Sequence, residues 1–234
     1  MMRSHLALFL SHSDADRVVD QGWKTREDVG VVNPGIDDFF ASSVPLEQRH
    51  DVAFVGTFFE RKGSDVVASA MSRVLRARPA LNFVLFGTGI AADTVVGAFA
   101  EDVRPRVSAV GPLSPPDLAR RLGELAVLLF PTRYEGFGIV VTEAMRAGLA
   151  VVTTPTGAGV DVVRDGVNGL LVPFGSADAA AAAVERLVDD PALRIRLARA
   201  AVADTTDRSW ARAAREVVAV YERARSLAAR GRDG

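Results

Sequence analysis

Short apolar runs recur along the chain and alternate with longer segments in which apolar and polar residues are mixed. Because the runs are rich in Val, Leu and Phe and end at Gly, Pro or Thr, they predict β-strands. Strands that alternate with helix-length segments indicate βαβ units on a parallel sheet. The five runs are DVAFVG (51–56), LNFVLFG (81–87), RVSAVG (106–111), AVLLFP (126–131) and LAVVTT (149–154).

The segments between and after the runs carry helix start signals. Ser114 and Asp117 form a capping-box-like start before the fourth run, and Asp190 with Pro191 opens a helix over ALRIRLARAAVA. The alanine-rich segment ADAAAAAVERL predicts another helix. Since the strands are apolar throughout, helices should cover both faces of the sheet. The predicted fold is α/β, with a doubly wound, Rossmann-like parallel sheet.

The two ends of the chain predict further elements. Near the N-terminus, DADRVVDQG predicts a short helix and GVVNPGID a strand that runs into a Pro-Gly turn. A final helix is expected from Ser209 onward, with Trp210 anchored in the core and a polar RGRDG tail. The apolar run from Leu6 to Leu10 is too short for a signal peptide or a membrane span, so we expect no transmembrane segment.

Composition excludes several classes of function. The chain has 234 residues, 49% of them hydrophobic, and its 28 Lys and Arg balance 29 Asp and Glu for a net charge of -1. Without a basic excess, nucleic acid is not an expected partner. Cysteine is absent, which excludes disulfides and thiolate sites and is compatible with a cytoplasmic location. The histidines, His5, His12 and His50, lack the spacing of a zinc site, so no metal is expected.

Candidate binding residues follow the first of the five runs. In TFFERKGSDVV, Arg61 and Lys62 come just before Gly63 and a predicted helix start. Free backbone N–H groups and the helix dipole favour an anion there, and two cations suit a diphosphate. The alternative is that Arg61 and Lys62 are solvated loop charges.

The second run ends in GTGIAAD, which raises a different possibility. Gly87 and Gly89 belong to a G-x-G-x-x-A pattern that is also found in the phosphate-binding turn of nicotinamide and flavin oxidoreductases. Such a site needs an acidic residue at the end of the next strand, but 110–113 reads VGPL. The alternative is that Gly87 and Gly89 have a purely structural role and only allow the chain to turn tightly.

The fourth run leads into PTRYEGFGIVVTEAMRAG, where Glu135 and Glu143 stand eight positions apart. Gly136 and Gly138 have no Cβ, so their backbone can approach a ligand closely and present N–H groups to phosphate or sugar oxygens. Carboxylates accept hydrogen bonds from sugar hydroxyls and stabilise a developing oxocarbenium ion. Alternatively, Glu135 favours a helix N-terminus and Glu143 is a surface residue of a helix.

The stretch YEGFGIVVTEAMRAGLAVVTT resembles the nucleotide-sugar-binding signature of retaining glycosyltransferases of the GT-B fold, family 4. Glu135 and Glu143 match the E-x7-E motif of this family, and VNPGID, VGTFFERKG, FGTG and GVNGLLVP follow the family order from about Val32 to Tyr221. Many members carry Arg where this chain has Thr57, and we expect the Arg61-Lys62 pair to substitute for it.

The resemblance implies specific roles. Glu143 would hold the donor ribose hydroxyls, Glu135 with the backbone of 136–139 would face the donor sugar and diphosphate as the catalytic group, and Arg61 with Lys62 would hold the diphosphate. The 110–113 loop would lie by the base. The candidate site residues are therefore Arg61, Lys62, Gly87, Gly111, Glu135, Gly136, Phe137, Gly138, Ile139 and Glu143.

GT-B enzymes have two Rossmann-like lobes, and here only about thirty residues precede VNPGID. The expected organisation is a remnant of the N-terminal acceptor lobe plus linker (1–32), a nucleotide-sugar-binding domain (33–208) and a C-terminal helix with its tail (209–234). The chain would be the donor-binding half of a glycosyltransferase: a shortened gene product, an engineered fragment or a split protein.

Such an enzyme would transfer a hexose from a nucleotide diphosphate sugar to an unknown acceptor with retention and without a metal or other cofactor. A separate N-terminal lobe would be a further partner, and the chain alone would be inactive. The alternatives are a nucleotide-sugar-binding module without chemistry or, less favoured, a dinucleotide-binding oxidoreductase.

Overall fold

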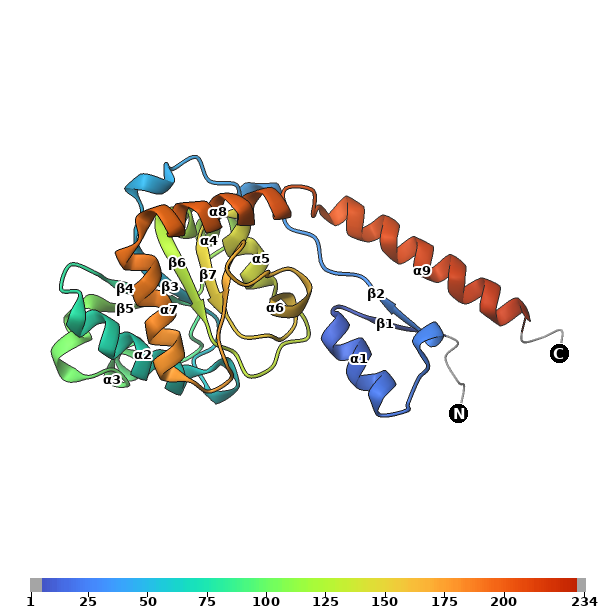
Figure 1. The fold of residues 1–234 in the computed structure, drawn as a ribbon, viewed down its shortest axis with the longest axis horizontal. Helices are drawn as coiled ribbons and strands as arrows, with labels where there is room; N and C mark the ends of the chain where they lie inside the picture. Colours follow the sequence, from blue (N-terminus) through green and yellow to red (C-terminus); the bar gives the residue numbers. More distant parts are fainter. Residues whose placement is uncertain (1–5, 231–234) are drawn as a thin grey trace.

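The computed structural model describes residues 6–230, which form a large six-stranded unit and a small two-stranded unit beside it (Figure 1). His5 and most of the polar tail, 231–234, lie outside the described residues. Among the described helices, none is both long and apolar enough to cross a membrane.

The large sheet is entirely parallel and runs in the order β5-β4-β3-β6-β7-β8. Counted from its own first strand, this is the order 3-2-1-4-5-6 of doubly wound folds, with the order reversing between β3 and β6. The predicted fold class is confirmed. The strands are β3 (His50–Val55), β4 (Phe83–Phe86), β5 (Val107–Val110), β6 (Leu125–Phe130), β7 (Ala150–Thr153) and β8 (Leu170–Leu171).

Five of these six strands coincide with the predicted apolar runs. Most of their positions are buried, and β4, β6 and β7 are buried at every position. Strand β8 is missing from the prediction because its two residues are too few to make an apolar run.

Helices cover the sheet as its apolar strands require. α2 contacts α7, and α5 contacts α4 and β7. The predicted caps are present: Ser114 Oγ accepts from the Asp117 amide at 3.3 Å, and the Asp190 carboxylate accepts from the Leu193 amide at 2.9 Å. The helices are α1 (His12–Asp20), α2 (Ser64–Ala77), α3 (Ala92–Gly97), α4 (Pro115–Leu122), α5 (Ile139–Arg146), α6 (Ala158–Asp161), α7 (Ala177–Asp189), α8 (Pro191–Thr205) and α9 (Trp210–Arg230). Short 3-10 turns lie at Arg26–Asp28, Asp38–Phe40, Leu46–Gln48, Glu60–Lys62 and Glu101–Arg106.

The small unit is one βαβ motif in which β1 (Ala7–Phe9) pairs in parallel with β2 (Val29–Val31) and α1 lies between them in sequence. The C-terminal helix α9 returns to this unit (Figure 1). Arg223 on α9 donates to the Val29 carbonyl at 3.2 Å, and a Cβ at Gly30 would lie 3.2 Å from Val220. The two ends of the chain are therefore packed together.

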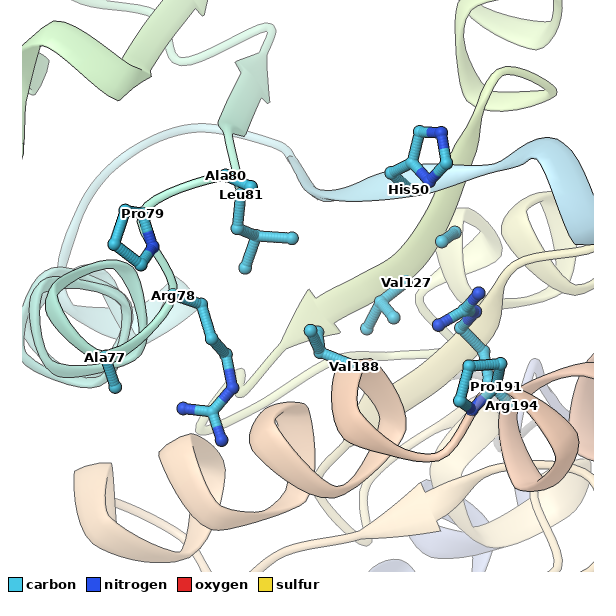
Figure 2. Close-up of a pocket in the computed structure, with 11 residues that line it drawn as sticks. His50, Ala77, Arg78, Pro79, Ala80, Leu81, Val127, Val188, Pro191 and Arg194 are labelled. Carbon is cyan, nitrogen blue, oxygen red and sulfur yellow. The ribbon is translucent and has the colours of Figure 1, made fainter.

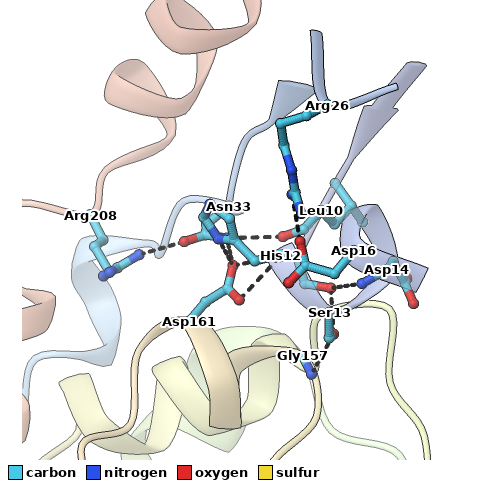
Figure 3. A network of polar contacts seen from close by, with 11 residues as sticks. Leu10, His12, Ser13, Asp14, Asp16, Arg26, Asn33, Gly157, Asp161 and Arg208 are labelled. Carbon is cyan, nitrogen blue, oxygen red and sulfur yellow. Dashed lines mark hydrogen bonds and ion pairs between the residues drawn. The ribbon is translucent and has the colours of Figure 1, made fainter. Parts of the chain in front are cut away.

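A cluster of polar side chains joins the small unit to the large one (Figure 3). The Asp161 carboxylate, 1% exposed, accepts from the His12 amide at 3.1 Å and from Asn33 Nδ2 at 2.7 Å. Arg208 donates to Asn33 Oδ1 at 3.2 Å. These bonds connect α1, the linker after β2 and α6.

The prediction that Trp210 anchors the core is wrong, because its side chain is 48% exposed. Its backbone is what packs inside: a Cβ at Gly35 would lie only 2.3 Å from the Trp210 amide nitrogen, so the linker runs directly against the start of α9. The backbone at Trp210 is therefore in close contact with the linker, while the residue as a whole is half exposed.

Candidate functional site

The candidate site lies where β3 and β6 end, side by side in the sheet. Ligands of open parallel sheets bind at the carboxyl ends of the strands where the strand order reverses, and that point is between β3 and β6. The loop 56–63 follows β3 and the loop 131–138 follows β6. Both carry residues that the sequence predicts to bind a ligand.

Gly63 allows these two loops to touch. It takes the left-handed conformation, with φ 76°, between the 3-10 turn Glu60–Lys62 and helix α2. A Cβ at Gly63 would lie 2.3 Å from the carbonyl oxygen of Pro131, which is far inside contact distance. The predicted position of Arg61 and Lys62 just before a helix start is confirmed.

Hydrogen bonds fasten the two loops along their length. The Arg61 carbonyl accepts from the Arg133 amide at 2.9 Å, and Thr132 Oγ1 lies 3.1 Å from the same carbonyl oxygen. The Arg133 guanidinium makes two bonds of 2.7 Å to the Asp65 carboxylate at the start of α2, and these lower the pKa of Asp65. The Arg61 side chain donates to the Tyr134 carbonyl at 3.1 Å.

Lys62 and Glu135 form an ion pair at the base of the site. Lys62 Nζ lies 2.5 Å from Glu135 Oε1, and their side chains are 16% and 10% exposed. Thr132 Oγ1 donates to the same oxygen at 3.0 Å, and the ammonium lies 5.2 Å from the centre of the Phe130 ring. The positive charge that the sequence assigns to a diphosphate is thus also the partner of the candidate catalytic carboxylate.

The backbone around Glu135 is fixed by its neighbours. The Glu135 amide donates to Thr156 Oγ1 at 3.4 Å. Gly138, with φ 80°, is the N-cap of α5, and a Cβ there would lie 3.2 Å from Glu135 Cγ. A side chain at position 138 would displace Glu135, so glycine here sets the position of the carboxylate.

Of the other loop residues, Gly136 is half-buried, and Ile139 is the first residue of α5. Phe137 is buried, 4% exposed, and its carbonyl accepts from the Ala158 amide at 2.6 Å. Phe137 therefore attaches the loop to α6 and offers only its amide to a ligand.

Glu143 lies on α5, and no described residue makes a hydrogen bond or ion pair with its side chain. Its carboxyl is largely removed from water, which raises its pKa to about 7, and the nearby charge of Asp37 adds to the increase. A half-buried carboxyl without a partner is available to a ligand. Among the described residues, no hydrogen bond or ion pair joins Glu143 to the Lys62 and Glu135 pair.

Gly87 and Gly111 directly follow β4 and β5, so they also lie at the carboxyl ends of the strands. The Gly87 amide donates to the Val110 carbonyl at 3.2 Å, so this N–H is not free for a phosphate. No atom lies within 4 Å of a Cβ built at either glycine, so both face open space. The turn at Gly87 and Gly89 follows β4, not the strand at the reversal point, which argues against the oxidoreductase alternative.

Three site residues are absent from the sequence prediction. Thr132 and Thr156 hold Glu135 in place, and Asp37 lies near Glu143. Asp37 closes the VNPGID motif, so its position in that motif is a signal in the sequence. No local pattern marks the two threonines, because their roles depend on how separate loops meet.

A cavity of about 500 Å³ lies at the other end of the strands, where they begin (Figure 2). It is lined by His50 at the start of β3, Leu81 before β4, Val127 in β6, and Arg78 and Arg194 from the surrounding helices and loops. Arg78 is already paired with Asp189 and Glu185. Because this cavity is at the amino ends of the strands, it is separate from the candidate site.

Comparison with known families matches residues 49–190 to the model described as glycosyl transferases group 1. Among curated proteins, the chain is 31% identical over 224 residues to a D-inositol 3-phosphate glycosyltransferase from Nocardioides sp., covering 85% of this chain and 49% of the relative. An enzyme of the same name from Kribbella flavida is 32% identical over 217 residues, covering 84% of this chain and 51% of the relative. The chain thus spans about half the length of the curated relatives it matches.

Solved structures share the fold. A glycosyltransferase from Rickettsia africae superposes with a TM-score of 0.81 at 16% identity, covering 94% of this chain and 64% of the other. HepE from Anabaena, solved in complex with UDP and glucose, gives a TM-score of 0.77 at 19% identity, covering 93% and 63%. Sucrose-phosphate synthase from Thermosynechococcus elongatus gives 0.74 at 24% identity, covering 92% and 57%.

Proposed function

Because this chain belongs to the group 1 glycosyl transferases, we propose that it is the donor-binding half of a retaining, metal-independent glycosyltransferase. The reaction is the transfer of a hexose from a nucleotide diphosphate sugar to an acceptor of unknown identity. The observation that carries the proposal is the Lys62–Glu135 ion pair at the strand-order reversal, beside the start of α5 at Gly138.

Each part of this arrangement has a chemical task. Arg61, Lys62 and the free amides at the start of α5 bind the diphosphate and stabilise the charge that develops on it as a leaving group. Glu135 faces the sugar, where a carboxylate favours the positive charge that develops at the anomeric carbon. Glu143, a carboxyl without a partner, accepts hydrogen bonds from the ribose hydroxyls.

Uridine is the first base to test. HepE from Anabaena was solved with UDP and glucose and also with UDP-glucose, and TarM from S. aureus was solved with UDP. The exposed Gly111, after β5, is the part of the site that we assign to the base, and Gly87 lies one strand closer to the diphosphate.

The acceptor side of the site requires a second lobe. In the small unit Leu8, Leu10 and Trp23 are 39%, 51% and 72% exposed, and exposed apolar side chains of this size suit burial against more protein. We therefore propose that residues 1–32 are a remnant of an N-terminal acceptor lobe with its linker, that 33–208 bind the donor and that 209–234 are the C-terminal helix and its tail. The cytoplasmic location expected from the sequence stays a prediction.

The test has two parts. A thermal-shift series with UDP, GDP, ADP and dTDP identifies the nucleotide, because a ligand of the native state raises apparent stability by mass action. The chain is then incubated with the matching nucleotide hexose and a mixture of lipid, sugar and protein acceptors, and release of nucleoside diphosphate is measured. We expect binding without turnover, and turnover when an N-terminal lobe is supplied.

Other outcomes separate the alternatives. Sustained turnover of about 1 per second by the chain alone would refute the half-enzyme proposal. Binding that never leads to transfer, with any lobe, would instead favour a nucleotide-sugar-binding module. A thermal shift with NADH and with none of the nucleoside diphosphates would favour an oxidoreductase.

A further inference from the structure

Asp14, on helix α1 of the small unit, faces the loop that carries Glu135. The Tyr134 hydroxyl donates to both Asp14 carboxylate oxygens at 3.3 Å. A Cβ at Gly136 would lie 3.7 Å from Asp14 Oδ2, and apart from its two chain neighbours no other described residue comes within 4 Å of it. A carboxylate from the N-terminal end of the chain is therefore placed directly beside the backbone next to Glu135.

The position of Asp14 is fixed by the first turn of α1 (Figure 3). Ser11, fully buried, caps the helix by accepting from the Asp14 amide. Ser13 Oγ accepts from the Gly157 amide at 3.2 Å. A Cβ at Gly157 would lie 2.2 Å from the Phe137 carbonyl oxygen, so the turn, the 154–158 loop and the glycine-rich loop pack as one body.

The Asp14 carboxylate also has spare acceptor capacity and no described cation close to it. A carboxylate offers about four acceptor positions, and Tyr134 supplies one hydroxyl over two long bonds. Among the described residues, no cation lies within 4.0 Å of Asp14; Arg17 stacks on the Tyr134 ring instead, at 5.4 Å. Asp14 can accept a hydrogen bond from a neighbouring ligand hydroxyl, whereas a neighbouring anionic group would be repelled.

We propose that Asp14 is a specificity-determining residue that selects donors with a neutral sugar. It accepts a hydrogen bond from a hydroxyl of the transferred hexose, and its charge disfavours a hexuronate at the same position. This inference rests on the proposed function, since it needs the donor sugar to lie beside Gly136. It goes beyond that function by naming a residue of the small unit and the sugar class it admits.

The experiment is a calorimetric titration of the chain with UDP, UDP-glucose and UDP-glucuronate. The parent should bind UDP-glucose about tenfold more tightly than UDP-glucuronate, the scale of one interaction with a charged group. Asp14→Asn, which keeps the size but removes the charge, should bring the two affinities to within about twofold of each other. Asp14→Ala should lose about tenfold in affinity for UDP-glucose while its affinity for UDP stays that of the parent.

The matched control is Asp20→Asn, which makes the same charge change at the exposed end of the same helix and should keep the parent's ratio. A purely structural role for Asp14 would weaken UDP, UDP-glucose and UDP-glucuronate alike. The inference is overturned if the parent does not discriminate between the two sugars, or if Asp14→Asn discriminates as the parent does. Absence of UDP binding by the parent would overturn the uridine donor itself, a different failure.

Discussion

Lys62 Nζ lies 2.5 Å from Glu135 Oε1, and the two residues come from loops that follow neighbouring strands of the sheet. Both side chains are mostly buried, so neither charge is well solvated without the other. The pair therefore holds the two loops together before any ligand arrives. A diphosphate that binds Lys62 must share the ammonium with Glu135. Binding of the leaving group is therefore coupled to the position of the carboxylate that we assign to the sugar.

Lys62→Met, which keeps the length of the side chain, should lower the free energy of unfolding by about 3 kcal/mol. The reason is that the substitution leaves a buried carboxylate without its partner. Urea denaturation measures the effect, and the double variant Lys62→Met with Glu135→Gln should recover part of it. A single variant as stable as the parent would mean that the pair contributes nothing to the fold.

Arg61→Ala should weaken binding of UDP but not of uridine, because the contribution of the guanidinium is electrostatic and acts on phosphate. The loss should shrink as salt is added, since screening weakens exposed charges. The control is Arg120→Ala, an exposed arginine on α4. If Arg61→Ala distinguishes uridine from UDP as well as the parent does, the diphosphate is held by other groups.

Glu143→Ala should weaken nucleotide binding by about 1.5 to 3 kcal/mol, the range for hydrogen bonds to a charged partner. Isothermal calorimetry with UDP measures it above pH 7, where the Glu143 carboxyl is ionised. Glu222→Ala, an exposed residue of α9, is the control and should bind as the parent does. Equal affinities of Glu143→Ala and the parent would remove Glu143 from the ribose site.

The raised pKa of Glu143 predicts a pH dependence of stability. The carboxyl loses its proton at about pH 4.5 in the unfolded chain but holds it to about pH 7 in the fold. Between these values the folded state binds more protons, so the free energy of unfolding falls as pH rises, by about 3 kcal/mol in total. Denaturation across this window should show the fall in the parent and its loss in Glu143→Gln. Parallel profiles for the two proteins would refute it.

Gly63→Ala tests the close approach of the two loops. The new Cβ would lie 2.3 Å from the Pro131 carbonyl oxygen, in addition to the strain of a side chain at φ 76°. Gly166→Ala is a matched control, because Gly166 has φ 69° but nothing within 4 Å of its Cβ position. Gly166→Ala should cost about 1 kcal/mol of stability and Gly63→Ala clearly more. Equal losses in thermal unfolding would show that the loops move apart easily.

The sequence by itself determined the sheet and most of its helices. Runs such as AVLLF (126–130) are apolar at every position because both faces of β6 are covered, and Ser114 and Asp190 cap helices through bonds to amides three residues ahead. These signals are local, so they can be read without knowing the fold. Loops that follow parallel strands all lie at the carboxyl ends of those strands. The sequence therefore also predicts that Arg61 and Glu135 lie near each other.

Only the tertiary structure decided which of these residues touch. Lys62 and Glu135 are 73 positions apart, and their contact depends on β3 lying next to β6 and on Gly63 admitting the Pro131 carbonyl. The burial of the Trp210 backbone depends on the linker at Gly35 running against the start of α9, and the approach of Asp14 to Gly136 depends on how the small unit packs against the large one. Such contacts depend on how distant segments pack against each other, and the spacing of residues along the chain does not indicate that packing.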